Sequence, residues 1–501
     1  MLILISCLTL LANDEVQSAD DIKQFIKQAE KLTRKGKFDE AEIILRRVIL
    51  QNPSDSSAKL SLAYVLLKKQ DIAGAYKYAL EIAKTDTKNA RAFAVLGVTL
   101  LNLGNFKDAR LILAKAYQLD KKEPLAWFGA GMLDFYENRI PDSLPKLLEA
   151  EFLDSAEPDF TFSLAQVLAR AEKYSEAGDA YERFLRNAPI SDTERRLRIK
   201  GLISFLRYLG SKRHLYLIDK DVEQTTVPIE LTNLRPIIEV GINGKKEKFR
   251  FVLDTGSGIS VISDKTAQRL KIKPVARGGL ARAIGGDGKF EIVYGFINSL
   301  TIGEAKIQYV PVYIRKFHDD GGGEVDGYIG LSLISKFLTT VDYGNLSFTL
   351  SRKNKNSIEK FESEAPALPL RLTSSGFLSG EVQIEGIESP LNFIVDTGAS
   401  VSVISNFLAN SVELSRFQMD EKMRVVGAAG VTENVDLFML PRVTFGSHSG
   451  EGIRAISLNL DVINEASGFQ QAGILGGNFL QNYRLTFDFQ NSKVTFVPNK
   501  K

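Results

Sequence analysis

The sequence contains very little cysteine, histidine or tryptophan. Its 501 residues include one cysteine, Cys7, three histidines and one tryptophan. One cysteine and three widely scattered histidines leave almost no material for a zinc site or a cysteine–histidine catalytic pair. We therefore expect neither a metal ion nor another cofactor, and any enzymatic chemistry must use other groups.

Neither sign of charge dominates the sequence. Lysine and arginine together number 64, aspartate and glutamate 61, and the formal net charge is +3. Proteins that bind nucleic acid ordinarily carry a clear excess of positive charge, so we expect no nucleic-acid partner. Hydrophobic residues make up 44% of the chain, enough for packed cores, and its length predicts two or three domains.

Long apolar runs are also missing. Met1 to Ala12 are nearly all apolar, but this stretch is too short to span a bilayer and lacks the basic start of a secretory signal. The sequence Leu4-Ile5-Ser6-Cys7 resembles a bacterial lipoprotein box, in which Cys7 would be lipidated. We expect residues 1–20 to be a signal or lipoprotein-like segment that places the protein in the cell envelope, periplasmic or lipid-anchored. The alternative is a frayed hydrophobic N-terminus on a cytoplasmic protein.

Small residues recur with a period of 34 between residues 22 and 210. One set contains Ala29, Ala63, Gly97, Gly131 and Ala165, and a second set, twelve residues later, contains Ala41, Ala75, Ala109, Ser143 and Ala177. A helix hairpin needs small side chains where its two helices cross closely. The pattern resembles five tetratricopeptide repeats with a capping helix near residues 192–209. It predicts an all-α solenoid over residues 21–210.

The concave groove of such a solenoid has two possible uses. It can hold a peptide or a partner protein, or it can serve as a spacer or support for the rest of the chain. We expect a protein partner in the groove, although the sequence does not identify that partner.

After residue 210, one segment is written twice. Residues 239–263 (EVGINGKKEKFRFVLDTGSGISVIS) and 381–405 (EVQIEGIESPLNFIVDTGASVSVIS) are identical at twelve of 25 positions, with an offset of 142. The same offset pairs Gly285 with Gly427 and Gly288 with Gly430. Alternating β-branched residues between glycine turns predict strands. We therefore expect two equivalent β domains at 211–355 and 356–501, joined by a polar link near residues 354–365.

Each copy resembles a lobe of an aspartic peptidase. An apolar strand runs into Asp-Thr-Gly, a glycine-flanked hairpin follows 31 residues after the aspartate, and an apolar pair with glycine comes later (Ile329-Gly330, Leu475-Gly476). Short lobes that both keep a flap are closer to retropepsin-like lobes than to pepsin, whereas two lobes in one chain follow the plan of pepsin. The resemblance implies an all-β bilobal peptidase built from two barrel lobes.

The resemblance also implies the site residues. The catalytic pair would be Asp254 and Asp396, one ionised to activate water and one protonated to polarise the scissile carbonyl. The threonine of each triad would bond to the opposite lobe. The residues expected to support the dyad are Thr255, Gly256, Ser257, Thr397, Gly398 and Ala399. Those expected in the flaps are Gly285, Gly286, Asp287, Gly288, Gly427, Ala428, Ala429 and Gly430.

Two features depart from the family. The residue after each triad can donate a hydrogen bond to the neighbouring aspartate, but only Ser257 has a hydroxyl, because Ala399 occupies the second position. A donor favours the charged form, so we expect Asp254 to be the more readily ionised partner. Neither glycine hairpin contains a tyrosine, so the flap contact that pepsin makes through tyrosine has no counterpart.

The sequence thus predicts an aspartic endopeptidase that acts as a single chain on protein or peptide substrates. The repeats would recruit substrate and take no part in the chemistry, so a fragment starting near Ser211 is expected to cut short peptides. The alternatives are a catalytically inactive peptidase-fold scaffold and a peptide-binding interaction protein. A peptidase made from single lobes of two chains is disfavoured, since each chain holds both aspartates.

Overall fold

The computed structural model describes residues 19–190, 193–212, 214–219, 221–286, 288–318, 321 and 323–500. The expected N-terminal segment with Cys7, and Asp287 in the first flap, lie outside these residues. The chain forms two compact units by internal contacts. One runs up to Leu133 and includes Pro145–Ser163 and Arg186–Asp192. The other contains Asp134–Leu144, Leu164–Leu185 and the chain from Thr193 onward.

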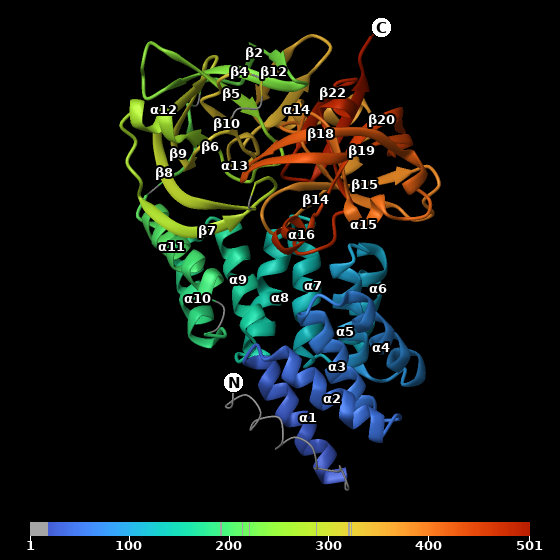
Figure 1. Cartoon of the computed structure of the whole chain (residues 1–501). Coiled ribbons are helices and arrows are strands. Elements are labelled where there is room, and N and C mark those ends of the chain that lie inside the picture. The colour runs from blue at the N-terminus through green and yellow to red at the C-terminus, as the bar shows by residue number, and fades with distance from the viewer. Residues whose placement is uncertain are drawn as a thin grey trace, which may run out of the picture. The chain divides into compact units, whose positions relative to one another are not determined.

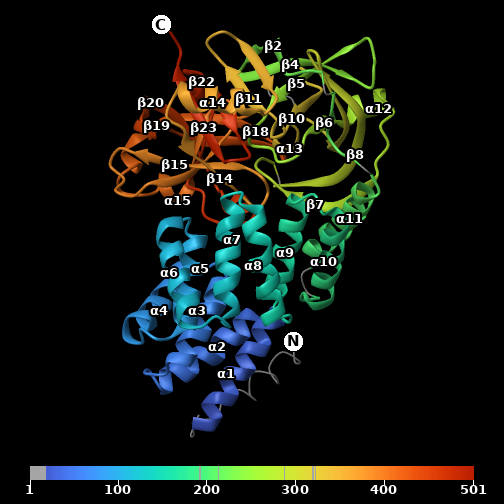
Figure 2. The same ribbon diagram turned by 180° about the vertical axis from the view of Figure 1, so that it is seen from behind.

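The first part of the described chain is helical, drawn in blue to green in Figures 1 and 2. Consecutive helices form five hairpins, and an eleventh helix follows them, as the repeat period predicts. The hairpins are α1 (Ala19–Arg34) with α2 (Phe38–Gln51), α3 (Ser56–Lys68) with α4 (Ile72–Thr85), α5 (Ala90–Asn102) with α6 (Phe106–Leu119), α7 (Pro124–Tyr136) with α8 (Ile140–Leu153) and α9 (Pro158–Arg170) with α10 (Tyr174–Asn187); α11 is Thr193–Gly210.

The small residues of the repeat lie where the helices of a hairpin cross. Ala41 and Ala75 are fully buried. A Cβ added at Gly97 would lie 2.6 Å from the Leu113 side chain of the partner helix. Side chains this close leave no room for a larger residue, so the 34-residue period follows from helix packing. The prediction of a tetratricopeptide solenoid is confirmed.

The first β lobe follows α11. Its strands form a sheet in the order β1-β9-β6-β10-β5-β4-β8-β7, with β3 on β4, and a further pairing of β8 with β9 closes part of the sheet into a barrel. The strands are β1 (Leu217–Ile218), β3 (Glu230–Thr232), β4 (Arg235–Ile242), β5 (Lys248–Leu253), β6 (Val261–Ser263), β7 (Ala276–Arg282), β8 (Lys289–Ile302), β9 (Ala305–Arg315) and β10 (Gly327–Ile329); the short helices are α12 (Asp264–Arg269) and α13 (Leu331–Ile334).

The second β lobe repeats this topology except for β1, which has no counterpart among its strands. Its order is β14-β15-β16-β21-β17-β20-β19-β18, and the pairing of β15 with β19 closes the barrel. Its elements are β14 (Arg371–Leu372), β15 (Leu378–Ile384), β16 (Leu391–Val395), β17 (Ser402–Ser405), α15 (Asn406–Ala409), η2 (Ser415–Phe417), β18 (Gln418–Gly427), β19 (Gly430–Phe445), β20 (His448–Leu458), α16 (Asp461–Ser467), β21 (Gly473–Leu475) and α17 (Gly477–Leu480). The expectation of two equivalent barrel lobes is confirmed.

A six-stranded sheet joins the lobes, in the order β13-β23-β22-β11-β12-β2. Three strands come from lobe 1, namely β2 (Gln224–Pro228), β11 (Leu338–Asp342) and β12 (Ser347–Ser351); three come from lobe 2, namely β13 (Leu368–Pro369), β22 (Tyr483–Asp488) and β23 (Lys493–Pro498). The lobes meet where β11 runs antiparallel to β22, with Thr340 opposite Thr486. This shared sheet fixes the position of one lobe relative to the other through backbone hydrogen bonds.

The polar link between the lobes is helical rather than extended. Helix α14 spans Lys355–Glu364. Asn354 caps it by accepting from the Ser357 amide, while the Ser357 hydroxyl accepts from the Asn354 amide. This reciprocal cap satisfies two free amides at the helix start.

Among the described residues, no helix combines the length and hydrophobicity that crossing a membrane would require.

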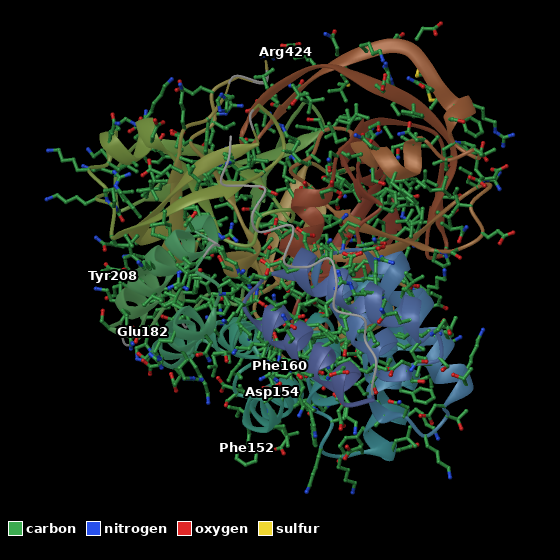
Figure 3. All side chains as sticks on the ribbon, turned by 60° about the horizontal axis from the view of Figure 1, so that its bottom comes forward. Phe152, Asp154, Phe160, Glu182, Tyr208 and Arg424 are labelled. Atoms are coloured by element: carbon green, nitrogen blue, oxygen red, sulfur yellow. The ribbon has the colours of Figure 1, made fainter. Side chains whose placement is uncertain are left out.

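Helix α11 packs on the first of the two flaps, the β7–β8 hairpin, and both views show the two side by side (Figures 1 and 2). The Phe205 ring stacks on Tyr294 of β8 with centroids 4.2 Å apart. Tyr208, labelled in Figure 3, lies edge-on to Phe296 at 5.5 Å. A Cβ at Gly201 would overlap the backbone of β7. A fragment that begins near Ser211 would lack α11 and would expose these rings.

Candidate active site

The two aspartates lie at equivalent turns of the two lobes. Asp254 follows β5, which pairs in parallel with β10, and Asp396 follows β16, which pairs in parallel with β21. The Asp254 amide donates to Ile329 O at 3.0 Å, and the Asp396 amide donates to Leu475 O at 3.0 Å. The apolar–glycine sequences late in each copy therefore hold the backbone of the aspartate loops.

One serine in each lobe completes this support. The Gly330 amide donates to Ser260 Oγ at 3.1 Å, and the Gly476 amide donates to Ser402 Oγ at the same distance. Ser260 is identical in both copies of the sequence, but the sequence analysis assigned it no role. The sequence did hold a signal for this residue, because a serine stands at the same distance after the Asp-Thr-Gly triad in both copies.

The triad threonines bind across the lobes in a symmetric set of four hydrogen bonds. The Thr255 amide donates to Thr397 Oγ1 at 3.2 Å, and the Thr397 amide donates to Thr255 Oγ1 at 3.0 Å. Each hydroxyl in turn donates to the opposite strand, from Thr255 to Val395 O and from Thr397 to Leu253 O, both at 2.7 Å. Both threonines are buried. This network ties the two aspartate loops together.

The triad glycines are required because the opposite carboxylate lies so close. A Cβ at Gly398 would lie 2.7 Å from Asp254 Oδ1, and one at Gly256 would overlap the Asp396 carboxylate. Their amides also bind the aspartate of their own lobe: Gly256 N donates to Asp254 Oδ1 at 3.0 Å and Gly398 N donates to Asp396 Oδ1 at 2.8 Å. The two carboxyls are therefore brought together over a floor of backbone donors.

The carboxyl environments differ. Burial, followed by the charge of Asp396 and a hydrogen bond to it, raises the pKa of Asp254 well above its ordinary value. Burial also raises the pKa of Asp396, but backbone donors and the hydrogen bond from Asp254 work in the opposite direction. Two carboxyls this close share one proton, because both cannot ionise cheaply side by side.

The expected role of Ser257 is wrong. Its hydroxyl donates to Ile259 O at 2.8 Å rather than to an aspartate. The hydroxyl thus bonds to a carbonyl only two residues along the chain, and it stabilises the turn instead of the charged form of Asp254. The expectation that Asp254 is the more readily ionised partner therefore loses the hydrogen bond on which it was based.

Two hairpins form the flaps. Flap 1 is β7–β8 and flap 2 is β18–β19, and their tips hydrogen-bond to each other. Gly286 N donates to Val431 O at 3.1 Å, and Ala429 N donates to Ile284 O at 3.0 Å. Gly285 has φ +99°, in the region that side chains rarely adopt, so the tip turn requires glycine. Gly427 and Gly430 end β18 and start β19, and Gly288 precedes β8.

Flap 2 has a more exposed outer strand than flap 1. Arg424 of β18 lies at the outer edge of the ribbon in Figure 3 and pairs with Glu433 of β19 at 3.2 Å. Among the described residues, no cluster of histidine, cysteine, aspartate and glutamate is arranged to hold a metal ion. The groups gathered at the centre of the site are thus two carboxyls, backbone amides and the two flap tips.

Comparison with known proteins matches both parts of the chain. Residues 238–333 and 380–479 match the family model described as aspartyl protease, once in each lobe. Residues 26–90 and 128–191 match the tetratricopeptide repeat model. The two aspartates lie within the matched segments of the aspartyl protease family.

Individual relatives match the repeats. Tetratricopeptide repeat-containing protein trd-1 of Caenorhabditis elegans is 34% identical over 97 residues, which is 19% of this chain and 12% of that protein. A thermophilic TPR protein of Thermus thermophilus is 20% identical, with a TM-score of 0.32, over 36% of this chain and 98% of the other. The solved structure of pilF from Pseudomonas aeruginosa is 18% identical, with a TM-score of 0.28, over 38% and 87%. The chain thus contains segments that match the tetratricopeptide repeat model and, once in each β lobe, a segment that matches the aspartyl protease model.

Proposed function

We propose that the protein is an aspartic endopeptidase whose catalytic residues are Asp254 and Asp396. The observation that carries this proposal is the half-buried pair of hydrogen-bonded carboxyls, whose loops are held together by the crossed threonine bonds. A buried pair of like charges is costly to the fold, and such pairs occur where the chemistry needs them. A scaffold without activity would gain nothing from keeping both.

The two carboxyls can divide the acid–base work of amide hydrolysis. The ionised aspartate removes a proton from water as the oxygen attacks the carbonyl carbon. The protonated aspartate gives its proton to the carbonyl oxygen, so the tetrahedral intermediate carries no full charge. When the C–N bond breaks, the leaving nitrogen takes the proton now held by the first aspartate, and the intermediate returns a proton to the second. The flaps would cover the substrate and pair with its backbone as an added strand.

The proposal is tested by incubating the full chain with a peptide library between acidic and neutral pH, with and without pepstatin. Cleavage should be seen in wild type and be absent in Asp254→Asn and Asp396→Asn. Glu388→Gln, on an exposed loop of lobe 2, is the matched control for loss of a carboxylate and should keep activity. Binding of peptides without cleavage by wild type would favour the interaction-protein alternative.

We also propose that the active species is one chain, because both aspartates belong to the same compact unit. Activity per chain should stay constant on dilution. A fall with the square of concentration would instead indicate a site shared between two chains.

The repeats are proposed to recruit a protein substrate through their groove. Within the first unit, polar contacts link distant helices of the array: Lys68 of α3 pairs with Glu157 at 2.6 Å and with Asp159 at 2.5 Å, and Tyr64 donates to Glu157 at 2.7 Å. Placement in the cell envelope, with lipid attached at Cys7, is proposed from the sequence alone. Metabolic labelling with a palmitate analogue would test it, with Cys7→Ser as control.

A further inference from the structure

Arg315 lies inside the half of the cleft that lobe 1 forms. It is the last residue of β9, and its Nη1 donates to Ala428 O at the tip of flap 2 over 3.1 Å. Its guanidinium also lies 4.9 Å from the ring centroid of Phe317 and 5.5 Å from that of Tyr328. Burial and Asp396 raise the pKa of Asp254, whereas the charge of Arg315 lowers it. Arg315 thus contacts the tip of flap 2 and lies close enough to Asp254 for its charge to act on that carboxyl.

Lobe 2 has an apolar residue at the equivalent place. Arg315 is the register partner of Ser263 in the β6–β9 ladder. In the β17–β20 ladder of lobe 2, the partner of the equivalent serine is Leu458. The two rings beside Arg315 are replaced as well, by Leu460 and Ile474, which belong to an apolar cluster. All three positions thus differ between the lobes. Lobe 1 has a cation beside two aromatic rings, whereas lobe 2 has three aliphatic side chains.

Within the described part of the chain, no acidic side chain forms an ion pair with Arg315, and the bond to Ala428 is its one hydrogen bond there. A guanidinium carries five N–H donors, so most of its capacity remains for another acceptor. Burial lowers the pKa of Arg315, since the charge is partly removed from water. A cation removed from water without a paired carboxylate costs stability, and a ligand carboxylate would supply the opposite charge.

We propose that Arg315 selects substrates with an aspartate or glutamate side chain on one side of the scissile bond, the side that lies against lobe 1. This inference rests on the proposed peptidase function. A peptide across two equivalent lobes meets Arg315 on one side and Leu458 on the other, so an acidic residue is preferred on the first side and an apolar residue on the second. The active dyad carries negative charge and would otherwise repel an acidic neighbour.

Matched peptides test the inference. Each pair differs only by glutamate or glutamine, placed first on one side of the cleaved bond and then on the other. For wild type, kcat/KM should favour the glutamate form by about tenfold or more on one side, as a charge-assisted hydrogen bond predicts. Arg315→Leu should remove this ratio and Arg315→Lys should retain part of it. Arg442→Leu, an exposed arginine of β19 paired with Glu451, makes the same change in net charge and should leave the ratio intact.

The reciprocal variant sharpens the test. Leu458→Arg should create a preference for glutamate on the opposite side of the bond. The wild-type preference should also disappear below about pH 4, where the substrate carboxylate becomes protonated.

Three results would overturn the inference. If Arg315→Leu lowers cleavage of the glutamate and glutamine peptides by the same factor, Arg315 only holds flap 2 closed. If wild type cleaves peptides with no acidic preference on either side, the peptidase proposal stands and the role of Arg315 falls. If wild type cleaves nothing, the peptidase proposal fails. Recognition by Arg315 is then tested by the Kd values of the glutamate and glutamine peptides for Asp254→Asn, and equal values exclude it.

Discussion

The two lobes share every part that positions the aspartates and differ in the parts around them. The strand order is the same, the amide of each aspartate donates to the apolar residue before the later glycine, and each loop has its serine at 3.1 Å. The differences lie at Ser257 against Ala399, at Arg315 against Leu458, and in flap 1, which alone is covered by α11.

This contrast separates two kinds of constraint. A catalytic dyad needs two carboxyls held in one fixed geometry. Two Asp-Thr-Gly loops that bond to each other symmetrically supply this geometry. A substrate presents different residues on the two sides of its scissile bond. The helices also contact the two lobes differently: α11 packs on flap 1, whereas Tyr136 and Arg170 bond to backbone oxygens of lobe 2. The sequences of the two lobes can therefore differ at residues that contact the substrate or α11. They cannot differ at the residues through which the two aspartate loops contact each other.

The largest break in the comparison should come from the aspartates. Asp254→Asn and Asp396→Asn should each lower kcat by at least roughly 10²- to 10⁴-fold, because each removes one half of the acid–base cycle. Steady-state kinetics on one cleaved peptide would measure this. Substantial turnover by either folded variant would show that the lobes do not share one catalytic site.

The same variants have an expected effect on stability. Burial raises the pKa of both carboxyls, so the folded state holds protons more tightly than the unfolded state. The stability that this contributes is present at acidic pH and is lost as the pH rises through the raised values. Both asparagine variants should consequently lose less Tm than wild type between pH 4 and pH 7. Thermal unfolding followed by circular dichroism would measure the difference.

The next largest effect should come from the crossed threonines. Thr255→Val removes the donor to Val395 O and the acceptor for Thr397 N, which leaves two buried backbone groups unsatisfied. We expect a loss of about 2–4 kcal/mol in the free energy of unfolding, nearly equal for Thr255→Val and Thr397→Val. Denaturant titration would measure it. The double variant should fall short of the sum because both side chains belong to one network.

The contact of α11 with flap 1 should have a smaller effect. Gly201→Leu places a side chain against the backbone of β7 and should lower the free energy of unfolding by about 1–3 kcal/mol. Lys200→Leu, exposed on the same helix, is the control. Hydrogen exchange should quicken in β7–β8 while β18–β19 remains unchanged. An equal change in both flaps would mean that α11 does not act on flap 1 specifically.

Arg315 should set part of the pH dependence. Its charge lowers the pKa of Asp254, so Arg315→Leu should raise that pKa. The alkaline limb of kcat/KM reflects loss of the proton that the two aspartates share and should therefore move to higher pH in the variant. A profile measured on a peptide without acidic residues isolates this effect. An unmoved alkaline limb would place Arg315 outside the field of the dyad.

The smallest effect should come from the Ser257/Ala399 difference. Ser257→Ala loses the bond to Ile259 O and should cost about 1 kcal/mol of stability. Neither Ser257→Ala nor Ala399→Ser should move the acidic limb of the pH profile, because the serine does not touch the carboxyls. A shift of that limb in Ser257→Ala would restore the role expected from the sequence.

Much of this protein could be predicted from its sequence because it contains two kinds of internal repeat, and the copies of each can be aligned with one another. The period of 34 in small residues is a direct consequence of helix crossings such as Gly97 on Leu113, which involve neighbouring segments. The offset of 142 identified the aspartates, the glycines and the flap hairpins, because each copy has to build the same turn. Short-range geometry of this kind leaves a regular trace in the chain.

The tertiary structure alone decided what depends on contacts between distant segments. The Ser257 hydroxyl could have bonded to a carboxyl or to a carbonyl, and only the folded turn shows that it donates to Ile259 O. The shared sheet pairs β11 with β22, about as far apart as the two copies, and no local pattern specifies that register. Arg315 became a candidate only when the ladders placed it opposite Leu458 and its guanidinium reached flap 2. Such contacts depend on which distant segments lie side by side in the fold. The sequence gives the residues of each segment but does not specify which segments pack together.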